Sequence, residues 1–581
     1  MIIKIHITKM KHFILLITLL ITALSNSQTE LKVRDTISKE ISSIKNHNYT
    51  LHLEENQLAF LTLNQIGVDV AITAFDTEGE KMGEFDSPNG RFGPEKILIT
   101  STKKGFYKLQ VASIDSKDIQ GTYKFYVQQI VKKATTLFEQ VDQLFLPWDN
   151  INTPGAAVAI IKNDSIIYQN TFGSANLEYN IPITQKSVFI PGSIAKQFTA
   201  FSILLLEQEG KLSLDDDIRK YIPEIPDFGY TITLKHLANH TSGLREQAVL
   251  AALMGWQESD VVTTEQLLKV LNKQKALNFK PGEQYMYCNT GYTLLAEVVG
   301  RVSGQTFAKF TQENIFKPLK MVNSEFLDDH QTIVKNKAYS YYPRGNGFVK
   351  SVLNETAPGA SGLLTTIEDL SKWVLNFKNP TTGNAAIFKK MGTVGILNNG
   401  EKTNYGLALE RSTYKGLSEI GHGGAIGGFR ARIATFPEQD FAVIVIANTP
   451  SVHPINIPNQ VIDIFLKDKF IIETKEKTDV QPILDEVLEK QTPIDYTTFK
   501  NYVGKYYSDE LSTEYKFLLK KNKLIMSHPR LKMNLTPARK DVFVVDGWPE
   551  AEITFTRDIT NKIEGFSFSM VNVKNIMFSK R

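Results

Sequence analysis

The 581-residue chain has very little cysteine: Cys288 is the only one. A lone cysteine cannot form an intrachain disulfide, so we expect the hydrophobic core to hold the fold together. The chain also lacks a large excess of charge of one sign, because its formal net charge is only +4. This balance gives no reason to expect nucleic acid or an anionic membrane as a partner. The sequence has no H-E-x-x-H pattern to support His236 and His240 as metal ligands, so we expect both to be structural and predict no metal or organic cofactor.

Long apolar runs are absent apart from one stretch near the N-terminus, Phe13–Leu24. Lysines precede this run and the small residues Ser25-Asn26-Ser27 follow it. The pattern predicts a secretory signal peptide over residues 1–27, since the run is too short to span a bilayer; a membrane anchor is the alternative interpretation. We therefore expect an exported protein, periplasmic or secreted, with no transmembrane segment after cleavage.

The length of the chain predicts several domains. Residues 28–132 show short alternating strands, such as 68–73, separated by turn signals such as Pro88-Asn89-Gly90. This pattern predicts a β-sandwich. It resembles the pre-peptidase-type jelly-roll modules that are attached to secreted hydrolases.

Residues 135–470 mix both kinds of secondary structure. Hairpins are expected at 156–173 and 430–449, and helices between them at 194–209, 264–273, 291–303 and 366–377. Strands at both ends predict an α/β (α+β) domain, in which the terminal strands share one antiparallel sheet and the helices pack on it and form a second lobe. Residues 471–492 are polar and read as a linker. Residues 493–581 return to strands and predict a small antiparallel β-barrel.

A serine and a lysine three residues apart, Ser193 and Lys196, lie in an otherwise apolar stretch after Pro191-Gly192. On a helix, positions i and i+3 share one face, so the amine can assist the hydroxyl as a nucleophile. Ser193 at a helix start also offers its own backbone N–H to an oxyanion. The alternative is a capped helix start with Lys196 extending to water.

Two further motifs carry candidate chemistry. Tyr287 and Asn289 flank Cys288 before a helical pattern. A tyrosine beside an ammonium can be driven towards phenolate and become a general base, while Asn289 can hold the lysine and a substrate amide. The glycine-rich stretch 421–429 contains His422, a candidate donor to an anion or carbonyl. It also contains Gly423 and Gly424, which allow close backbone approach, and the N–H of Ala425, a second oxyanion donor. Cys288 itself is expected to be a small buried packing residue.

The order S-x-x-K, Y-x-N, H-x-G resembles the serine β-lactamase-like family, in its class C β-lactamase, D-peptidase and esterase branch. Segments 207–226, 231–244, 314–321 and 359–373 resemble that family as well. The resemblance implies that Ser193 is acylated, that Lys196 and Tyr287 move the proton, and that Asn289 positions lysine and substrate. It also implies that the amides of Ser193 and Ala425 form the oxyanion hole, and that His422 stands where many relatives have the lysine of K-T-G.

Two departures from the family pattern bear on the substrate. His422 replaces the lysine and Gly423 replaces the hydroxyl residue of K-T-G, which weakens the site that binds a substrate carboxylate in relatives. Arg430 and Arg432 follow the motif and are candidates to restore that contact; the alternative is that they are exposed strand residues.

We therefore predict an exported serine hydrolase that acts through an acyl-enzyme on an ester or amide, a D-amino-acid peptide being one candidate. The expected partner is a small-molecule or peptide substrate, with cell-wall fragments as another candidate. One alternative is a β-lactamase or D,D-carboxypeptidase. A second is a non-catalytic cell-envelope binding protein, in which the β-sandwich is the working part.

Overall fold

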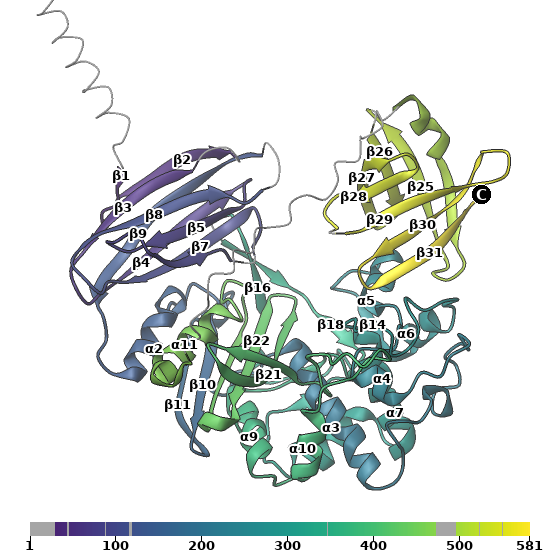
Figure 1. Cartoon of the computed structure of the whole chain (residues 1–581), viewed down its shortest axis with the longest axis horizontal. Helices are drawn as coiled ribbons and strands as arrows, with labels where there is room; N and C mark the ends of the chain where they lie inside the picture. The colour runs from purple at the N-terminus through teal and green to yellow at the C-terminus, as the bar shows by residue number, and fades with distance from the viewer. Residues whose placement is uncertain are drawn as a thin grey trace, which may run out of the picture. The chain divides into compact units, whose positions relative to one another are not determined.

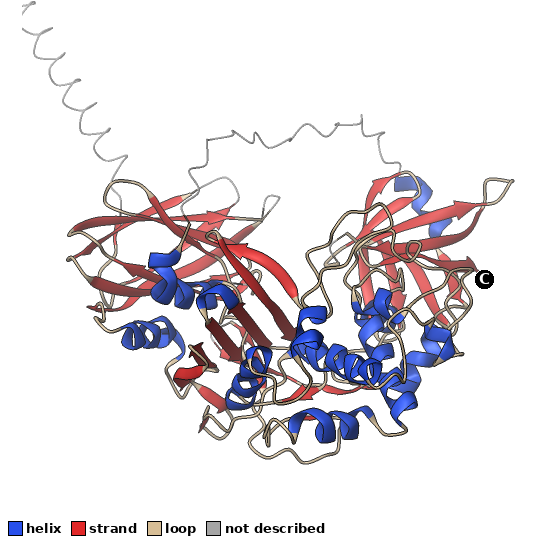
Figure 2. Cartoon of the chain, turned by 60° about the horizontal axis from the view of Figure 1, so that its bottom comes forward, coloured by secondary structure: helices blue, strands red, loops and turns tan. Residues whose placement is uncertain are grey.

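The structure is a computed structural model that describes residues 29–42, 46–87, 89–115, 119–345, 347–471, 496–521, 523–548 and 550–581. The predicted signal peptide and nearly all of the predicted linker lie outside these residues. The chain forms two compact units (Figures 1 and 2). The first contains residues up to 149 with segments 342–349 and 450–453, and the second contains the remainder. The residue boundaries predicted for the domains stay predictions.

The first unit contains the predicted β-sandwich, built from two sheets with strand orders β1-β3-β8-β5-β6 and β2-β9-β4-β7. Along strands such as β8, side chains alternate between the core and the outside: Tyr107, Leu109 and Val111 are fully buried, and the residues between them are only partly buried. The elements of this unit are β1 (Thr29–Glu30), β2 (Thr36–Ser42), β3 (His47–Leu53), β4 (Gln57–Ile66), β5 (Val70–Phe75), β6 (Lys81–Phe85), β7 (Phe92–Thr100), β8 (Gly105–Ser113), β9 (Gln120–Lys132), α2 (Leu137–Phe145) and the 3₁₀ turn η1 (Leu146–Trp148).

The second unit is organised by one antiparallel sheet with the order β11-β10-β23-β22-β21-β20. Strand β10 pairs with β23, so the first and last predicted hairpins share this sheet, as expected. The first hairpin turns at Asn163 and Asp164, which both have the positive φ that a tight hairpin turn needs. The strands are β10 (Ala156–Lys162), β11 (Ser165–Phe172), β20 (Glu410–Tyr414), β21 (Leu417–Ile426), β22 (Phe429–Phe436) and β23 (Phe441–Ala447).

Helices cover this sheet and form the predicted second lobe. Helix α9 packs on β10 and β23, while α11 also packs on β23. Every residue of β23 is buried, as expected for a central strand. The helices are α3 (Ala195–Gln208), α4 (Leu234–Ala238), α5 (Gln247–Leu253), α6 (Thr264–Leu271), α7 (Asn289–Ser303), α8 (Phe307–Thr311), α9 (Ile367–Lys378), α10 (Ala385–Met391) and α11 (Asn456–Leu466), with short turns η2 (Gly192–Ile194), η3 (Ile218–Lys220), η4 (Gln312–Phe316), η5 (Pro437–Gln439) and η6 (Lys467–Lys469).

Among the described residues, eight short strands also form two-stranded sheets, and segment 342–349 of the β16–β17 pair belongs to the first unit. They are β12 (Ser174–Asn176), β13 (Ile181–Pro182), β14 (Val261–Thr263), β15 (Glu325–Phe326), β16 (Ser340–Arg344), β17 (Gly347–Ser351), β18 (Asn354–Thr356) and β19 (Leu363–Leu364). In the described ranges, no helix has both the length and the hydropathy to cross a bilayer.

The C-terminal part confirms the predicted barrel, because β24 to β31 close on themselves in antiparallel pairs (Figure 1). Its buried side chains belong to the same core cluster as those of the sheet and helices of this unit. After the turn η7 (Tyr496–Tyr502), the strands are β24 (Gly504–Ser508), β25 (Thr513–Lys520), β26 (Lys523–His528), β27 (Leu531–Arg539), β28 (Val542–Val545), β29 (Glu552–Arg557), β30 (Ile563–Met570) and β31 (Val573–Lys580).

Candidate active site

Ser193 lies in the turn η2, immediately before helix α3. This turn packs closely against the backbone of strand β21. A Cβ on Gly192 would lie 2.8 Å from the Ala425 nitrogen, and a Cβ on Gly424 would lie 1.9 Å from the Pro191 oxygen. Only glycine fits at both positions. The predicted nucleophile and the predicted oxyanion strand are therefore side by side.

Lys196 is completely buried on the first turn of α3. Its Nζ lies 3.0 Å from Ser193 Oγ, 2.7 Å from Asn289 Oδ1 and 2.8 Å from the carbonyl oxygen of Ala360. Its presence in an apolar stretch is explained by this arrangement. The ammonium is enclosed, but its donors meet oxygen atoms and not hydrocarbon.

Tyr287 and Asn289 reach the same centre from the start of helix α7, for which Cys288 is the N-cap. The Tyr287 hydroxyl donates to Ser193 Oγ at 2.8 Å. Ser193 Oγ thus lies within hydrogen-bonding distance of both Lys196 and Tyr287, although 94 residues separate the serine from the tyrosine. The structure brings together the four residues predicted from the S-x-x-K and Y-x-N motifs.

The electrostatics of Tyr287 differ from the sequence-based expectation. Burial raises the pKa of its hydroxyl well above the ordinary value, and the carboxylates of Glu246 and Glu410 act in the same direction. The hydrogen bond to Ser193 opposes this shift without reversing it. In this structure Tyr287 is therefore a neutral phenol that donates a hydrogen bond to Ser193, and not a phenolate.

A family model described as Beta-lactamase matches residues 134–460, which is more than half of the chain. The chain belongs to the beta-lactamase family. The matched region contains Ser193, Lys196, Tyr287, Asn289 and His422, so the motif resemblance and the family match rest on the same part of the chain.

Relatives of this beta-lactamase-family chain include two D-aminopeptidases. That of Gluconobacter oxydans (strain 621H) is 26% identical over 297 residues, covering 51% of this chain and 56% of the relative. That of Brucella anthropi is 26% identical over 299 residues, covering 52% and 57%. The chain thus spans about half the length of the curated relatives it matches. Among solved structures, the octameric penicillin-binding protein homologue from Pyrococcus abyssi aligns with a TM-score of 0.50 at 24% identity, over 76% of this chain and 99% of that one. This likeness concerns the fold alone.

His422, which the motif resemblance places at the position of the K-T-G lysine, is buried with 2% of its surface exposed. Nδ1 lies 2.5 Å from the Gly423 carbonyl, and Nε2 lies 2.8 Å from the Tyr405 hydroxyl. Burial, together with the positive charge of Lys196, lowers the pKa of His422 to about 3. The ring is therefore neutral, and both nitrogens are already engaged. This differs from the expectation that it donates to a substrate.

Arg430 and Arg432 are held by groups of the protein. Arg432 pairs with the buried carboxylate of Glu419 and lies 3.6 Å from that of Glu410. Arg430 donates to the carbonyl groups of residues 427 and 429 at the β21–β22 turn. These contacts of both guanidinium groups lie within the sheet and its turn.

The remaining sequence candidates have structural contacts. Cys288 is 3% exposed, as predicted for a packing residue, and burial raises the pKa of its thiol to about 12. His236 forms a capping box with Thr233 at the start of α4. His240 accepts from the Cys288 N–H at 3.1 Å, and its ring centroid lies 4.2 Å from that of Tyr287. His240 thus packs against Tyr287, whereas the side-chain contacts of His236 are with Thr233 at the start of α4.

Sequence reasoning missed the residues that hold the motif residues in place. Glu246 accepts two hydrogen bonds from Asn289, and Tyr405 contacts His422. The Ala360 carbonyl accepts from Lys196. Ala360 lies within segment 359–373, and Glu246 follows segment 231–244 by two residues; both segments resemble the family in sequence. Glu246 and Tyr405 have no motif of their own.

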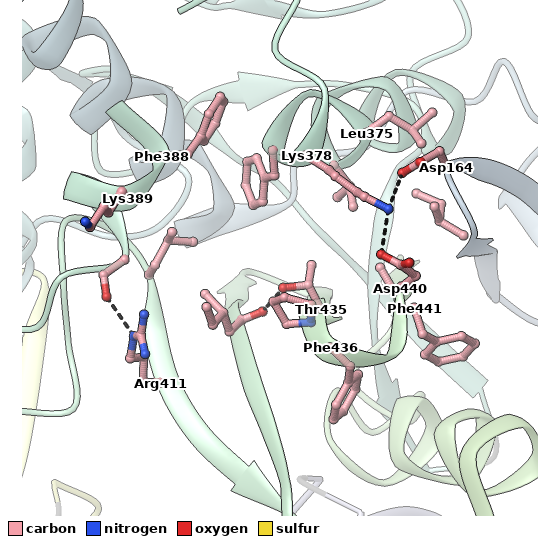
Figure 3. A pocket seen from close by; sticks show the side chains of 18 of the residues that line it. Asp164, Leu375, Lys378, Phe388, Lys389, Arg411, Thr435, Phe436, Asp440 and Phe441 are labelled. Carbon is pink, nitrogen blue, oxygen red and sulfur yellow. Dashed lines mark hydrogen bonds and ion pairs between the residues drawn. The ribbon is translucent and has the colours of Figure 1, made fainter. Parts of the chain in front are cut away.

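A separate cavity of about 510 Å³ lies between α9, α10 and the sheet (Figure 3). Its lining is largely apolar, with Leu375, Phe388 and Phe441 among the side chains. At one end Lys378 is ion-paired with both Asp164 and Asp440. None of the motif residues lines this cavity, so the chemistry of the family is not located there.

Proposed function

We propose that this chain is a serine hydrolase that forms an acyl-enzyme at Ser193 and acts on amides or esters, with D-amino-acid peptides and amides as the first class to test. The observation that carries the proposal is the position of Ser193 Oγ, 3.0 Å from Lys196 Nζ and 2.8 Å from Tyr287 Oη. The names of the D-aminopeptidase relatives support the choice of substrate class.

The first step is attack of Ser193 Oγ on the substrate carbonyl carbon. Asn289 Oδ1 and the Ala360 carbonyl each accept one hydrogen bond from Lys196 Nζ. A further tetrahedral direction at Nζ points to Ser193 Oγ. In its amine form Lys196 presents a lone pair there and accepts the serine proton. Tyr287 keeps its proton, because burial raises its pKa.

The tetrahedral intermediate carries a negatively charged oxygen. We propose that the backbone N–H groups of Ser193 and Ala425 donate hydrogen bonds to it. The close packing of Gly192 on Ala425 supports this assignment. The bond to the leaving amine or alcohol then breaks, and the Lys196–Tyr287 pair returns one proton to that group. Attack of water on the acyl group by the same route releases the acid and restores the serine hydroxyl.

The neutral state of His422 favours an esterase or a D-amino-acid amidase over a β-lactamase or D,D-carboxypeptidase. Those activities bind a substrate carboxylate at this place, and a fixed positive charge is the strongest recognition element for it. His422 supplies no charge near neutral pH. Substrates without a carboxylate beside the scissile bond therefore fit the proposal better.

Hydrolysis rates on three chromogenic substrates test the proposal: a short-chain ester, a D-alanyl anilide and a cephalosporin. We expect turnover of the anilide or ester and little turnover of the cephalosporin. Ser193→Ala is expected to abolish turnover, whereas Ser165→Ala, at an exposed serine of β11, is expected to leave it unchanged. Rapid cephalosporin turnover would favour a β-lactamase. Turnover by Ser193→Ala close to the unmutated rate would overturn the proposal. A folded chain with no turnover at all would favour a binding protein.

We also propose that the protein is exported. The predicted signal peptide over residues 1–27 supports this, and cleavage can be tested by the N-terminal sequence and location of the mature protein after cell fractionation.

A further inference from the structure

A short segment at the start of helix α5, residues 244–247, lies directly behind Asn289. The carboxylate of Glu246 accepts two hydrogen bonds from that residue. Oε2 accepts from the backbone N–H at 2.6 Å, and Oε1 accepts from the side-chain nitrogen Nδ2 at 3.2 Å. Glu246 is buried, with 3% of its surface exposed, and its carboxylate also caps α5. One buried carboxylate therefore holds both the backbone and the side chain of Asn289.

The chemistry of Glu246 determines the orientation of the Asn289 amide. A carboxylate only accepts hydrogen bonds, so it must face the amide nitrogen and not the amide oxygen. Oδ1 is thereby turned to Lys196, whose Nζ donates to it at 2.7 Å. If the amide were reversed, Nδ2 of Asn289 would face Lys196 Nζ. Both groups are hydrogen-bond donors, so Lys196 would lose this acceptor and its alignment with Ser193 Oγ.

The C-terminal barrel holds this segment from the other side. The carbonyl of Asn572, at the β30–β31 turn, accepts from the N–H of Glu246 at 3.1 Å. Next to it, Arg245 Nη1 donates to Glu510 of the β24–β25 loop at 2.5 Å, and Nη2 donates to the Asn575 carbonyl at 3.1 Å.

The Arg245–Glu510 pair is enclosed, with side chains 1% and 4% exposed. Such a pair resists displacement, because separating it would leave an uncompensated buried charge. The Arg245 carbonyl in turn accepts from Thr290 Oγ1 at 2.7 Å, on the first turn of α7. The barrel is therefore linked through residues 245 and 246 to the helix start that carries Asn289.

We propose that Glu246 is a positioning residue for acylation of Ser193, and that the barrel, through Glu510 and Asn572, fixes Glu246 in place. The inference rests on the proposed function, since it assigns these residues to the same serine chemistry. It gives the barrel a part in turnover that acts through Glu246 and does not require contact with the substrate.

The decisive comparison is Glu246→Gln against Glu246→Asp in the full-length protein. Glutamine matches the volume of glutamate, but its NH₂ group must face either the backbone N–H or the side-chain Nδ2 of Asn289, which are both donors, so one of the two hydrogen bonds that hold Asn289 is lost. Aspartate is shorter than glutamate, but its carboxylate, like that of glutamate, only accepts hydrogen bonds. We expect Glu246→Gln to lower the rate constant for labelling of Ser193 by a fluorophosphonate by about 10²-fold, the effect of a small misplacement of a reacting group. Glu246→Asp should lose less. A packing role predicts the opposite order, because aspartate leaves a cavity.

Labelling by the fluorophosphonate is followed by intact mass, which separates the rate constant from the fraction of sites that react. A merely structural loss lowers the fraction, whereas mispositioning lowers the rate constant of a fully reactive population. Glu265→Gln, at an exposed ion pair on α6, is the matched control and should label as the unmutated chain does. Equal rate constants for Glu246→Gln and the unmutated chain would overturn the proposal while leaving Ser193 as the nucleophile. Labelling of Ser193→Ala would instead remove the proposed function itself.

The barrel's part is tested by Glu510→Gln, with Glu514→Gln on β25 as the control at a partly exposed pair. We expect Glu510→Gln to lower the labelling rate constant about tenfold, a size typical of coupling through packed elements. It should have little further effect when Glu246→Gln is already present. Full additivity of the two changes, or no effect of Glu510→Gln in a folded protein, would show that the barrel does not act through Glu246. The comparison of Glu510→Gln with Glu514→Gln remains informative even if Glu246→Gln fails to fold.

Discussion

Replacing Gly192 with alanine tests whether the nucleophile and the oxyanion strand depend on their close approach. Gly192 has φ +56°, and a Cβ there would meet the nitrogen of Ala425 at 2.8 Å and its carbonyl carbon and oxygen at 3.0 Å. These are backbone atoms, so no side chain can rotate away. To reach an ordinary contact of 3.4 Å, the turn η2 and strand β21 must separate by about 0.6 Å.

Two effects contribute to the expected magnitude. An alanine held at positive φ costs about 1–2 kcal/mol of stability. The displacement of β21 from Ser193 removes the alignment of one proposed oxyanion donor, which costs about 10²–10³-fold in kcat in other hydrolases. We therefore expect Gly192→Ala to fold with modestly lower stability and to lose most of its turnover.

Gly210→Ala is the matched control, because Gly210 has φ +68° but no atom within 4 Å of its Cβ position. It should lose about 1 kcal/mol of stability and retain full activity. The assays are kcat on the chromogenic ester or anilide and the free energy of unfolding in urea. Full activity of Gly192→Ala would refute the argument that this contact aligns the site. Equal loss of activity in Gly210→Ala would show that backbone strain alone is responsible.

Three further predictions follow from the burial of individual side chains. His422 has a folded-state pKa of about 3 against an ordinary value of 6.5, so the unfolded chain binds a proton between these pH values that the folded chain does not. Stability should fall as pH decreases through this window, by about 2–3 kcal/mol at pH 4.5 relative to pH 7; urea unfolding of His422→Gln should show a pH dependence smaller by that amount, and an unchanged dependence would contradict the assignment. Tyr405→Phe removes the hydroxyl that contacts His422 Nε2 and should lower the free energy of unfolding by about 1–3 kcal/mol, because a buried acceptor is left without its donor; a change below about 0.5 kcal/mol would be too small for a buried hydrogen bond. Cys288, with a pKa raised to about 12 by burial, should resist iodoacetamide in the folded protein at pH 8 and react after denaturation, as followed by intact mass; rapid reaction of the folded chain would mean that the thiol is accessible.

The secondary structure that lies near the motifs was predictable because local patterns specify it. The hairpin at 156–173 has apolar runs on both sides of an Asn-Asp turn, and the structure forms it as β10 and β11. The helices expected at 194–209 and 366–377 form as α3 and α9 within one or two residues of the predicted ends. The pairing of β10 with β23 followed from a general rule, that strands at both ends of such a domain share a sheet.

The electrostatic state of the site was less predictable, since it depends on burial. A tyrosine near a lysine can be driven towards phenolate by the positive charge, or kept neutral by the loss of solvent. The sequence contains both residues but not the degree of enclosure, and in the structure desolvation is the larger effect on Tyr287. The same reason explains His422, whose ring is neutral and engaged by Gly423 and Tyr405.

By itself, the sequence determined which residue types make up the candidate site: serine and lysine at helical spacing, a tyrosine and an asparagine around a helix start, and a glycine-rich strand. These are local features, because spacing along one helix or strand sets which side chains share a face. Only the tertiary structure decided that Glu246 turns the Asn289 amide towards Lys196, and that Arg245 meets Glu510 across 265 residues of chain. Contacts between distant segments depend on how whole elements pack, and no local pattern of residues encodes that packing.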